Sequence, residues 1–187
     1  MALVSTFEVL LKPQLPTGLP AEFSDVSRLS RNILQGYFLT IANVNSFDLV
    51  LSLVFTTRLP SDVTLGEIIT FADTSGFNSG GSLEPVGAGN KYRFSPLFVP
   101  AEATALFILQ PSPTNTALTE LNIEARGYVD VQLSSLGGTP PTGAKIQVTA
   151  EQRGTFFAST DENIVNRALD QIAYGLTVQN GGLLTLN

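Results

Sequence analysis

The stretch Leu121-Asn-Ile-Glu-Ala-Arg-Gly-Tyr-Val-Asp-Val-Gln-Leu133 alternates apolar and polar residues along its whole length. Successive side chains of a β-strand point to opposite faces of the sheet, whereas a helix of the same residues would spread its apolar groups all round. The pattern therefore predicts a long strand with one face in the core and the other in water. Gly127, at its centre, predicts a bend or bulge. Glu124, Arg126, Tyr128 and Asp130 are expected on the water face.

Shorter segments of strand-like sequence occur on both sides of this stretch, and most prolines fall between them, where a missing N–H costs least. Two of the segments are apolar on both faces, which is typical of central strands, and the polar residues Val44–Asp48 between them predict a hairpin. Buried aromatic rings are expected at Phe7, Phe38, Phe55, Phe94 and Phe107. The expected strands are Ser5–Lys12, Ile33–Asn43, Leu49–Thr57, Thr64–Phe71, Lys91–Val99, Thr104–Gln110, Lys145–Ala150 and Gly154–Ala158.

The remaining segments predict one helix, one hairpin and one long loop. Ser159–Ile172 has helical spacing of apolar residues behind a capping-box pattern, although a strand over Gln171–Val178 is an alternative that shortens the helix. Tyr174–Val178 and Leu183–Leu186, on either side of an Asn-Gly pair, predict a C-terminal hairpin. Thr74–Asn90 contains five glycines and predicts a long loop.

These patterns predict a single all-β domain over residues 1–187. We expect an antiparallel two-sheet β-sandwich of eight to ten strands, jelly-roll-like, with one short α-helix in the C-terminal region. The helix would cover an open end or edge of the sandwich.

Composition excludes several classes of chemistry. Cysteine, histidine and tryptophan are absent, which excludes disulfides, thiolate nucleophiles, a Ser-His-Asp triad and the usual zinc sites, and we expect no cofactor. The net charge is −6, and the 10 Lys and Arg residues form no cluster, so we expect no binding to nucleic acid. The apolar stretches are too short to span a bilayer. The N-terminal segment lacks the pattern of a secretion signal, which favours a cytoplasmic protein or one exported within an assembly by another route.

Three weak candidate sites remain. Asp73, Ser75 and Asn78, with Glu84, offer oxygen ligands around a glycine in the manner of a calcium loop. Tyr128 is an outward aromatic residue that could bind a glycan or another small ligand. The acids Glu124 and Asp130 share one face, but six residues of extended strand separate them by about 20 Å, too far for a glycosidase pair. Glu124 and Arg126 are better interpreted as a solvated ion pair.

The absence of the usual catalytic side chains favours a non-enzymatic function. Few charges leave little repulsion between copies, and long regular strands leave edges that associate unless they are protected. We therefore expect a structural protein that assembles with copies of itself into a filament, shell or surface layer, with the C-terminal hairpin and the glycine-rich loop contributing contacts. The alternatives are a carbohydrate- or small-ligand-binding module and, less favoured, a carboxylate-dependent glycoside hydrolase.

Overall fold

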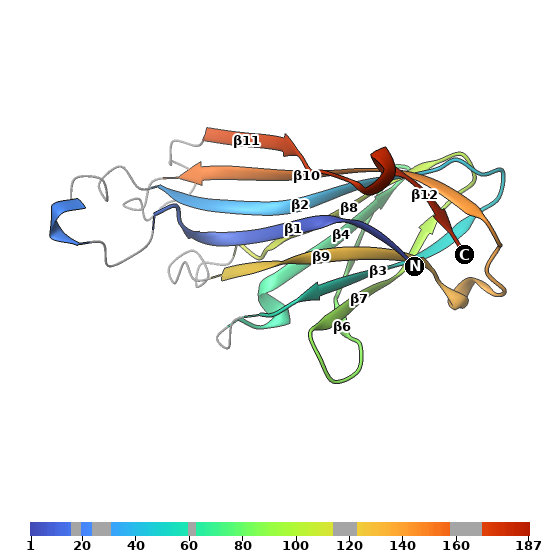
Figure 1. Cartoon of the computed structure of the whole chain (residues 1–187), viewed down its shortest axis with the longest axis horizontal. Helices are drawn as coiled ribbons and strands as arrows, with labels where there is room; N and C mark the ends of the chain where they lie inside the picture. The colour runs from blue at the N-terminus through green and yellow to red at the C-terminus, as the bar shows by residue number, and fades with distance from the viewer. Residues whose placement is uncertain (16–19, 24–30, 60–62, 114–122, 158–169) are drawn as a thin grey trace.

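The computed structural model describes residues 1–15, 20–23, 31–59, 63–113, 123–157 and 170–187, and this part of the chain is all-β (Figure 1). Twelve strands form one curled antiparallel sheet. The helical segments among the described residues are short 3-10 turns. The strands are β1 (Ala2–Pro13), β2 (Asn32–Asn43), β3 (Leu49–Thr57), β4 (Ile68–Thr74), β5 (Phe77–Gly81), β6 (Glu84–Pro85), β7 (Lys91–Val99), β8 (Thr104–Pro111), β9 (Ile123–Leu133), β10 (Ala144–Phe157), β11 (Asp170–Gly175) and β12 (Leu183–Leu186).

Strand pairing is nested. The first long strand pairs with the last of the central set, β1 with β9, and the next pairs are β2 with β8, β3 with β7 and β4 with β5. The short β6 extends the sheet beyond β7, while β11 and β12 lie beside β10. All of these pairings join residues far apart in the sequence except those of β4 with β5 and of β6 with β7.

The sheet divides at β2. One side of β2 pairs with β10 along its whole length, whereas Asn32–Gln35 pair with β1 and Tyr37–Ala42 pair with β8. Hydrogen bonds between β1 and β2 thus join the two halves into one sheet. The antiparallel all-β prediction is confirmed, but the expected separation into two sheets is not.

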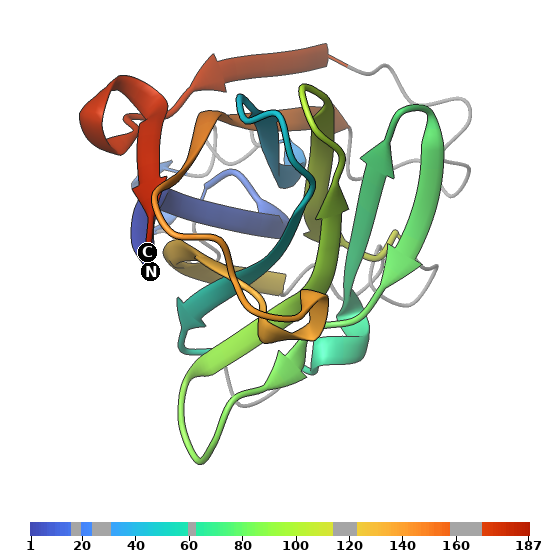
Figure 2. The same cartoon turned by 90° about the vertical axis from the view of Figure 1, so that its right-hand side faces the viewer.

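The core lies inside the curl of the sheet, which surrounds it in the end-on view (Figure 2). Four of the five predicted core phenylalanines are buried there, together with the fully buried Tyr37. The Phe107 ring packs against Phe55 at a centroid distance of 5.5 Å and against Phe94 at 4.9 Å, which brings β3 and β7 against β8 across the core. Phe38 is the exception, because it faces outward from β2 and is half-buried under Arg153.

The predicted hairpin at Val44–Asp48 is wrong, because β2 and β3 do not pair. The buried Asn43 amide instead organises a crossing from one half of the sheet to the other. Its Nδ2 donates to the carbonyls of Phe47 at 2.8 Å and Pro100 at 2.9 Å, and its Oδ1 accepts from the Asn45 backbone N–H at 3.0 Å. One side-chain amide can donate two hydrogen bonds and accept others, so Asn43 satisfies backbone groups of this connection that β2 and β3 do not satisfy by pairing with each other.

The C-terminal predictions are also corrected. β11 and β12 both pair with β10 and not with each other, so the expected hairpin is wrong. Asn180 and Gly181 have the expected positive φ, of 52° and 64°, but they lie in a 3-10 segment, Gln179–Gly182. After this segment, β12 pairs with β10. The predicted helix falls mostly on residues 158–169, outside the described residues. Its last residues belong to β11, as the alternative strand interpretation anticipated.

Several strand boundaries differ from prediction. The segment Thr64–Phe71 begins as a capped 3-10 turn, because Glu67 accepts from the Thr64 backbone N–H at 2.6 Å, and its strand runs from Ile68 to Thr74. Lys145–Ala150 and the following segment form one strand, β10, in which alternate side chains are buried. The glycine-rich loop Thr74–Asn90 contains two strands, β5 and β6, and not a continuous loop.

Candidate functional site

A groove of about 750 Å³ lies over the outer face of β1 and β9, beside the chain that follows β11. It contains Tyr128, the outward aromatic residue that the sequence singled out. The groove lining is mainly apolar, with hydroxyl and amide groups and the charged side chains of Asp130 and Lys91. The lining residues are Met1, Leu3, Val4, Ser5, Thr6, Lys91, Tyr128, Asp130, Thr177, Val178 and Gln179.

Strand register places the polar groups of the groove in two rows. Thr6, Tyr128, Thr56 and Lys91 lie opposite one another across β1, β9, β3 and β7. The next row contains Leu3, Asp130, Val54 and Arg93 on the same four strands. Side chains opposite each other on one face are close neighbours. Asp130 therefore stands between two aliphatic side chains.

Two local features position these rows. A register shift between Leu3 and Ser5 turns the Ser5 hydroxyl inward, where it bonds the buried Tyr37 hydroxyl at 2.9 Å. Gly127 allows β9 to approach β3 beside Tyr128, because a Cβ at this position would collide with the Thr56 carbonyl. The register of β9 with β1 continues through Gly127 without the predicted bulge, and the glycine instead permits close approach between strands.

Asp130 is the residue that sequence reasoning missed. The alternation placed it in water, but only 9% of its surface is exposed. Among the described residues, its carboxylate has neither a hydrogen bond nor an ion pair, and the same holds for the Lys91 ammonium in the same groove. Behind them, the buried Thr56 hydroxyl also has no partner in the described part of the chain. The groove thus presents a carboxylate and an ammonium that no side chain among the described residues binds, so both are open to water or a ligand.

The predicted ion pair between Glu124 and Arg126 is confirmed as part of a larger network. Glu124 binds both Lys12 and Arg126, and Arg126 also binds Glu8. The Lys12 hydrogen bond, with the nearby positive charges, lowers the pKa of Glu124 against the opposing effect of desolvation. The Glu8 hydrogen bond raises the pKa of Arg126. Both acids are bound by cations of the same chain.

The calcium candidates are only partly brought together. Asp73 on β4 lies opposite Asn78 on β5, and Ser75 forms the turn between them with a φ of 57°. Glu84 on β6 instead accepts from Arg93, with an Nη2–Oε2 distance of 3.5 Å. Within the described ranges, no three acidic residues gather as a metal site would require.

A smaller hollow of about 410 Å³ lies over β2, β10 and β11. Its arginine, Arg153, lies 4.6 Å from the Phe38 ring centroid and pairs with Glu151 at 2.8 Å. The charged group of this hollow is therefore already satisfied, in contrast to those of the Tyr128 groove.

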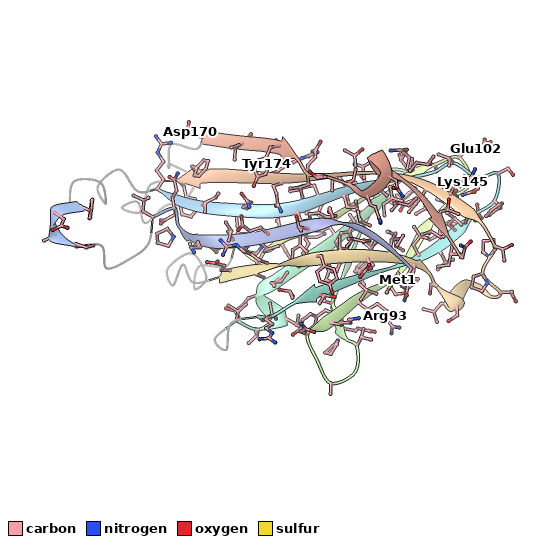
Figure 3. All side chains as sticks on the ribbon, viewed as in Figure 1. Met1, Arg93, Glu102, Lys145, Asp170 and Tyr174 are labelled. Atoms are coloured by element: carbon pink, nitrogen blue, oxygen red, sulfur yellow. The ribbon has the colours of Figure 1, made fainter. Side chains whose placement is uncertain are left out.

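A fully exposed strand, β11, runs along β10. All six of its residues are exposed, including Ile172 at 42% and Tyr174 at 43%, and β10 is its only strand partner in the described part of the chain. Its one charged residue, Asp170, pairs with Arg31. Figure 3 shows Asp170 and Tyr174 along this outermost strand, apart from Met1 at the rim of the groove.

Comparison with known proteins gives no relative: no family model matches the chain, and no curated protein or solved structure is significantly similar. No helix in the described ranges is long and apolar enough to cross a membrane.

Proposed function

We propose that this chain is a structural subunit that assembles with copies of itself through exposed strand edges. The observation that carries the proposal is β11, an edge strand exposed on both faces. An unprotected edge presents unpaired N–H and C=O groups, and proteins that must stay apart usually blunt it with charge, proline or a covering segment. Over Gln171–Gly175 the strand carries neither charge nor proline.

The backbone geometry of β11 supports this role. Leu176 donates its N–H to the Ala150 carbonyl at 2.8 Å, which continues the β10–β11 register. Because hydrogen-bonding direction alternates along a strand, Tyr174 and Ile172 also direct their backbone groups toward β10. The N–H groups of Gln171, Ala173 and Gly175 then point away from the sheet. A second copy of β11 placed antiparallel would meet these donors.

Charge also favours such a pairing. In an antiparallel pair of β11 strands with Ala173 opposite Ala173, the two Asp170 carboxylates would lie at opposite ends, about 20 Å apart at 3.4 Å per residue. Each carboxylate already binds Arg31 of its own chain. A two-fold contact of this kind is self-complementary, as in most homodimers. Phe77, 82% exposed on β5, offers a second apolar contact at another edge of the sheet.

For the fold we propose a jelly-roll sandwich. The nested pairing of β1 with β9, β2 with β8, β3 with β7 and β4 with β5 supports it, since a hairpin ribbon wound on itself gives this order. The proposed sheets are β1-β9-β3-β7 and β2-β8-β4-β5, with β10 added beside β2. Many functions share this architecture, so the exposed edge and not the fold carries the functional proposal.

The proposal also makes the protein non-enzymatic. A retaining or inverting glycosidase needs one carboxylic acid with a raised pKa to protonate the leaving group. Glu8 and Glu124 are two acids that the fold brings to the same cation, since both bind Arg126. The cations around Glu124 lower its pKa, which is the wrong direction for a general acid.

Sedimentation velocity tests the assembly. We expect the wild-type chain to sediment as species larger than its 19.9 kDa monomer. Ala173→Pro removes one outward N–H without removing a bond to β10, so it should shift the distribution toward monomer. Ala173→Val keeps the N–H and is the matched control, expected to assemble like the wild type. Far-UV circular dichroism checks that both variants are folded.

Two results would overturn the proposal. The first is a wild-type chain that remains monomeric at the highest soluble concentration. The second is an Ala173→Pro variant that assembles like Ala173→Val, because the outward backbone edge would then have no part in the contact.

A further inference from the structure

We propose that the Tyr128 groove binds a neutral saccharide, with the Asp130 carboxylate as the acceptor for its hydroxyl groups. This site lies on a different surface from the β11 edge and does not depend on assembly. It rests on one unsatisfied acid, one exposed aromatic ring and one groove that contains both.

The Asp130 carboxylate is the first part of the argument. Burial of an ionised group without a partner is unfavourable, and proteins normally supply a cation or several donors. Leu3 and Val54 stand opposite Asp130 on the neighbouring strands and can supply neither. Yet Asp130 lines an open groove, so a donor can reach it from outside the chain. A bound ligand with hydroxyl donors would replace the water that reaches the carboxylate there.

The other lining residues define the chemistry of that ligand. A flat amphipathic molecule could place its apolar face on the Tyr128 ring, 42% of whose residue surface is exposed. Thr6, Thr177 and Gln179 offer neutral hydrogen-bonding groups around it. A volume of about 750 Å³ lies in the range of ligand pockets, roughly 300–1,000 Å³. A sugar ring has both an apolar face and many hydroxyl groups.

Lys91 distinguishes a saccharide from a cationic ligand. An amine or guanidinium would satisfy Asp130, but the Lys91 ammonium lines the same groove and would repel it. A hydroxyl group both donates and accepts, so neighbouring hydroxyls can donate to Asp130 and accept from Lys91. The groove thus contains one negative and one positive side chain that do not bind each other, and this arrangement favours a neutral polyhydroxyl ligand.

A glycan array followed by calorimetric titration tests the proposal. We expect binding to at least one neutral oligosaccharide on the array, and that oligosaccharide is then titrated into each variant. Asp130→Asn should weaken binding about tenfold or more, because it removes hydrogen bonds to a charged group. Tyr128→Ala should weaken binding by a similar factor, whereas Tyr128→Phe retains the ring and should bind like the wild type.

Matched controls lie elsewhere on the sheet. Asp73→Asn changes another acid with an unpartnered carboxylate oxygen, and Tyr174→Ala removes a ring of nearly equal exposure. Both should leave saccharide binding unchanged. Circular dichroism of each variant excludes loss of folding as the cause of weaker binding, and putrescine is titrated as the cationic probe.

Three results would overturn the inference: no neutral glycan binds, putrescine binds while saccharides do not, or Asp130→Asn binds as tightly as the wild type. Sedimentation velocity on the same samples separates the two proposals. Failure of the groove proposal leaves assembly of the wild-type chain intact. Failure of the assembly proposal leaves a monomer that still binds the saccharide.

Discussion

Replacing Tyr37 by phenylalanine tests how β1 is tied to β2 beneath the groove. The Tyr37 hydroxyl and the Ser5 hydroxyl lie 2.9 Å apart, and both residues are buried, at 0% and 4% exposure. Burial raises the pKa of Tyr37, so the phenol is neutral and acts as an ordinary hydrogen-bonding partner. Tyr37→Phe leaves the Ser5 hydroxyl buried without a partner, and Ser5→Ala does the same to Tyr37.

Each single substitution should therefore cost about 2 kcal/mol, within the 1–3 kcal/mol typical of a buried unsatisfied polar group. The double variant removes both hydroxyls and should cost no more than either single change. The cycle then gives a coupling energy of roughly 2 kcal/mol. In urea unfolding followed by far-UV circular dichroism, each single variant should lower the midpoint by about 1 M for an m-value near 2 kcal/mol/M.

Additive effects in this cycle would refute the reasoning, since they would mean that the two hydroxyls do not satisfy each other. Single substitutions that cost less than about 0.5 kcal/mol would refute it too, because the site would then admit water. Unfolding is measured at two protein concentrations, since assembly makes apparent stability depend on concentration.

Two further predictions concern stability. Glu124→Gln should reduce the unfolding free energy at pH 7 by at most about 1 kcal/mol, because its ion pairs are partly exposed. The lowered pKa of Glu124 means that this contribution is present above its ordinary value of 4.5 and is lost as pH falls through the folded-state pKa, so urea midpoints of variant and wild type should converge in acid. Gly127→Ala should cost about 1–3 kcal/mol in thermal unfolding, because its Cβ meets the Thr56 carbonyl, whereas Gly80→Ala on β5 meets open space and should be nearly neutral. Equal unfolding temperatures for the two glycine variants would contradict the close approach of β9 to β3.

The local pattern of apolar and polar residues predicted several strands well. The predicted segments Leu49–Thr57 and Lys91–Val99 coincide with β3 and β7, and the segment that ends at Leu133 contains β9. The apolar run of β3, buried on both faces, and the alternation of β9 mark these segments as strands regardless of which strand lies next to them.

Pairing partners could not be predicted in the same way. Short polar connections suggested two hairpins, yet the nested order pairs β1 with β9 and leaves β2 and β3 in different halves of the sheet. The buried Asn43 amide shows why: its side chain supplies the hydrogen bonds that a hairpin would have supplied through the backbone. Turn composition alone does not distinguish these two solutions.

Asp130 illustrates the same limit at the candidate site. Its parity within β9 placed it correctly on the outer face, but the outer face of a curled sheet is not uniformly wet. Which residues shield Asp130 depends on long-range register with β1 and β3, and no local pattern contains that register. Most positions of a well-folded sequence agree with their surroundings, whereas the Asp130 carboxylate lies between Leu3 and Val54 with no partner in the described part of the chain. Such a carboxylate, beside an exposed ring and facing a groove, is a stronger indication of binding than the ring by itself.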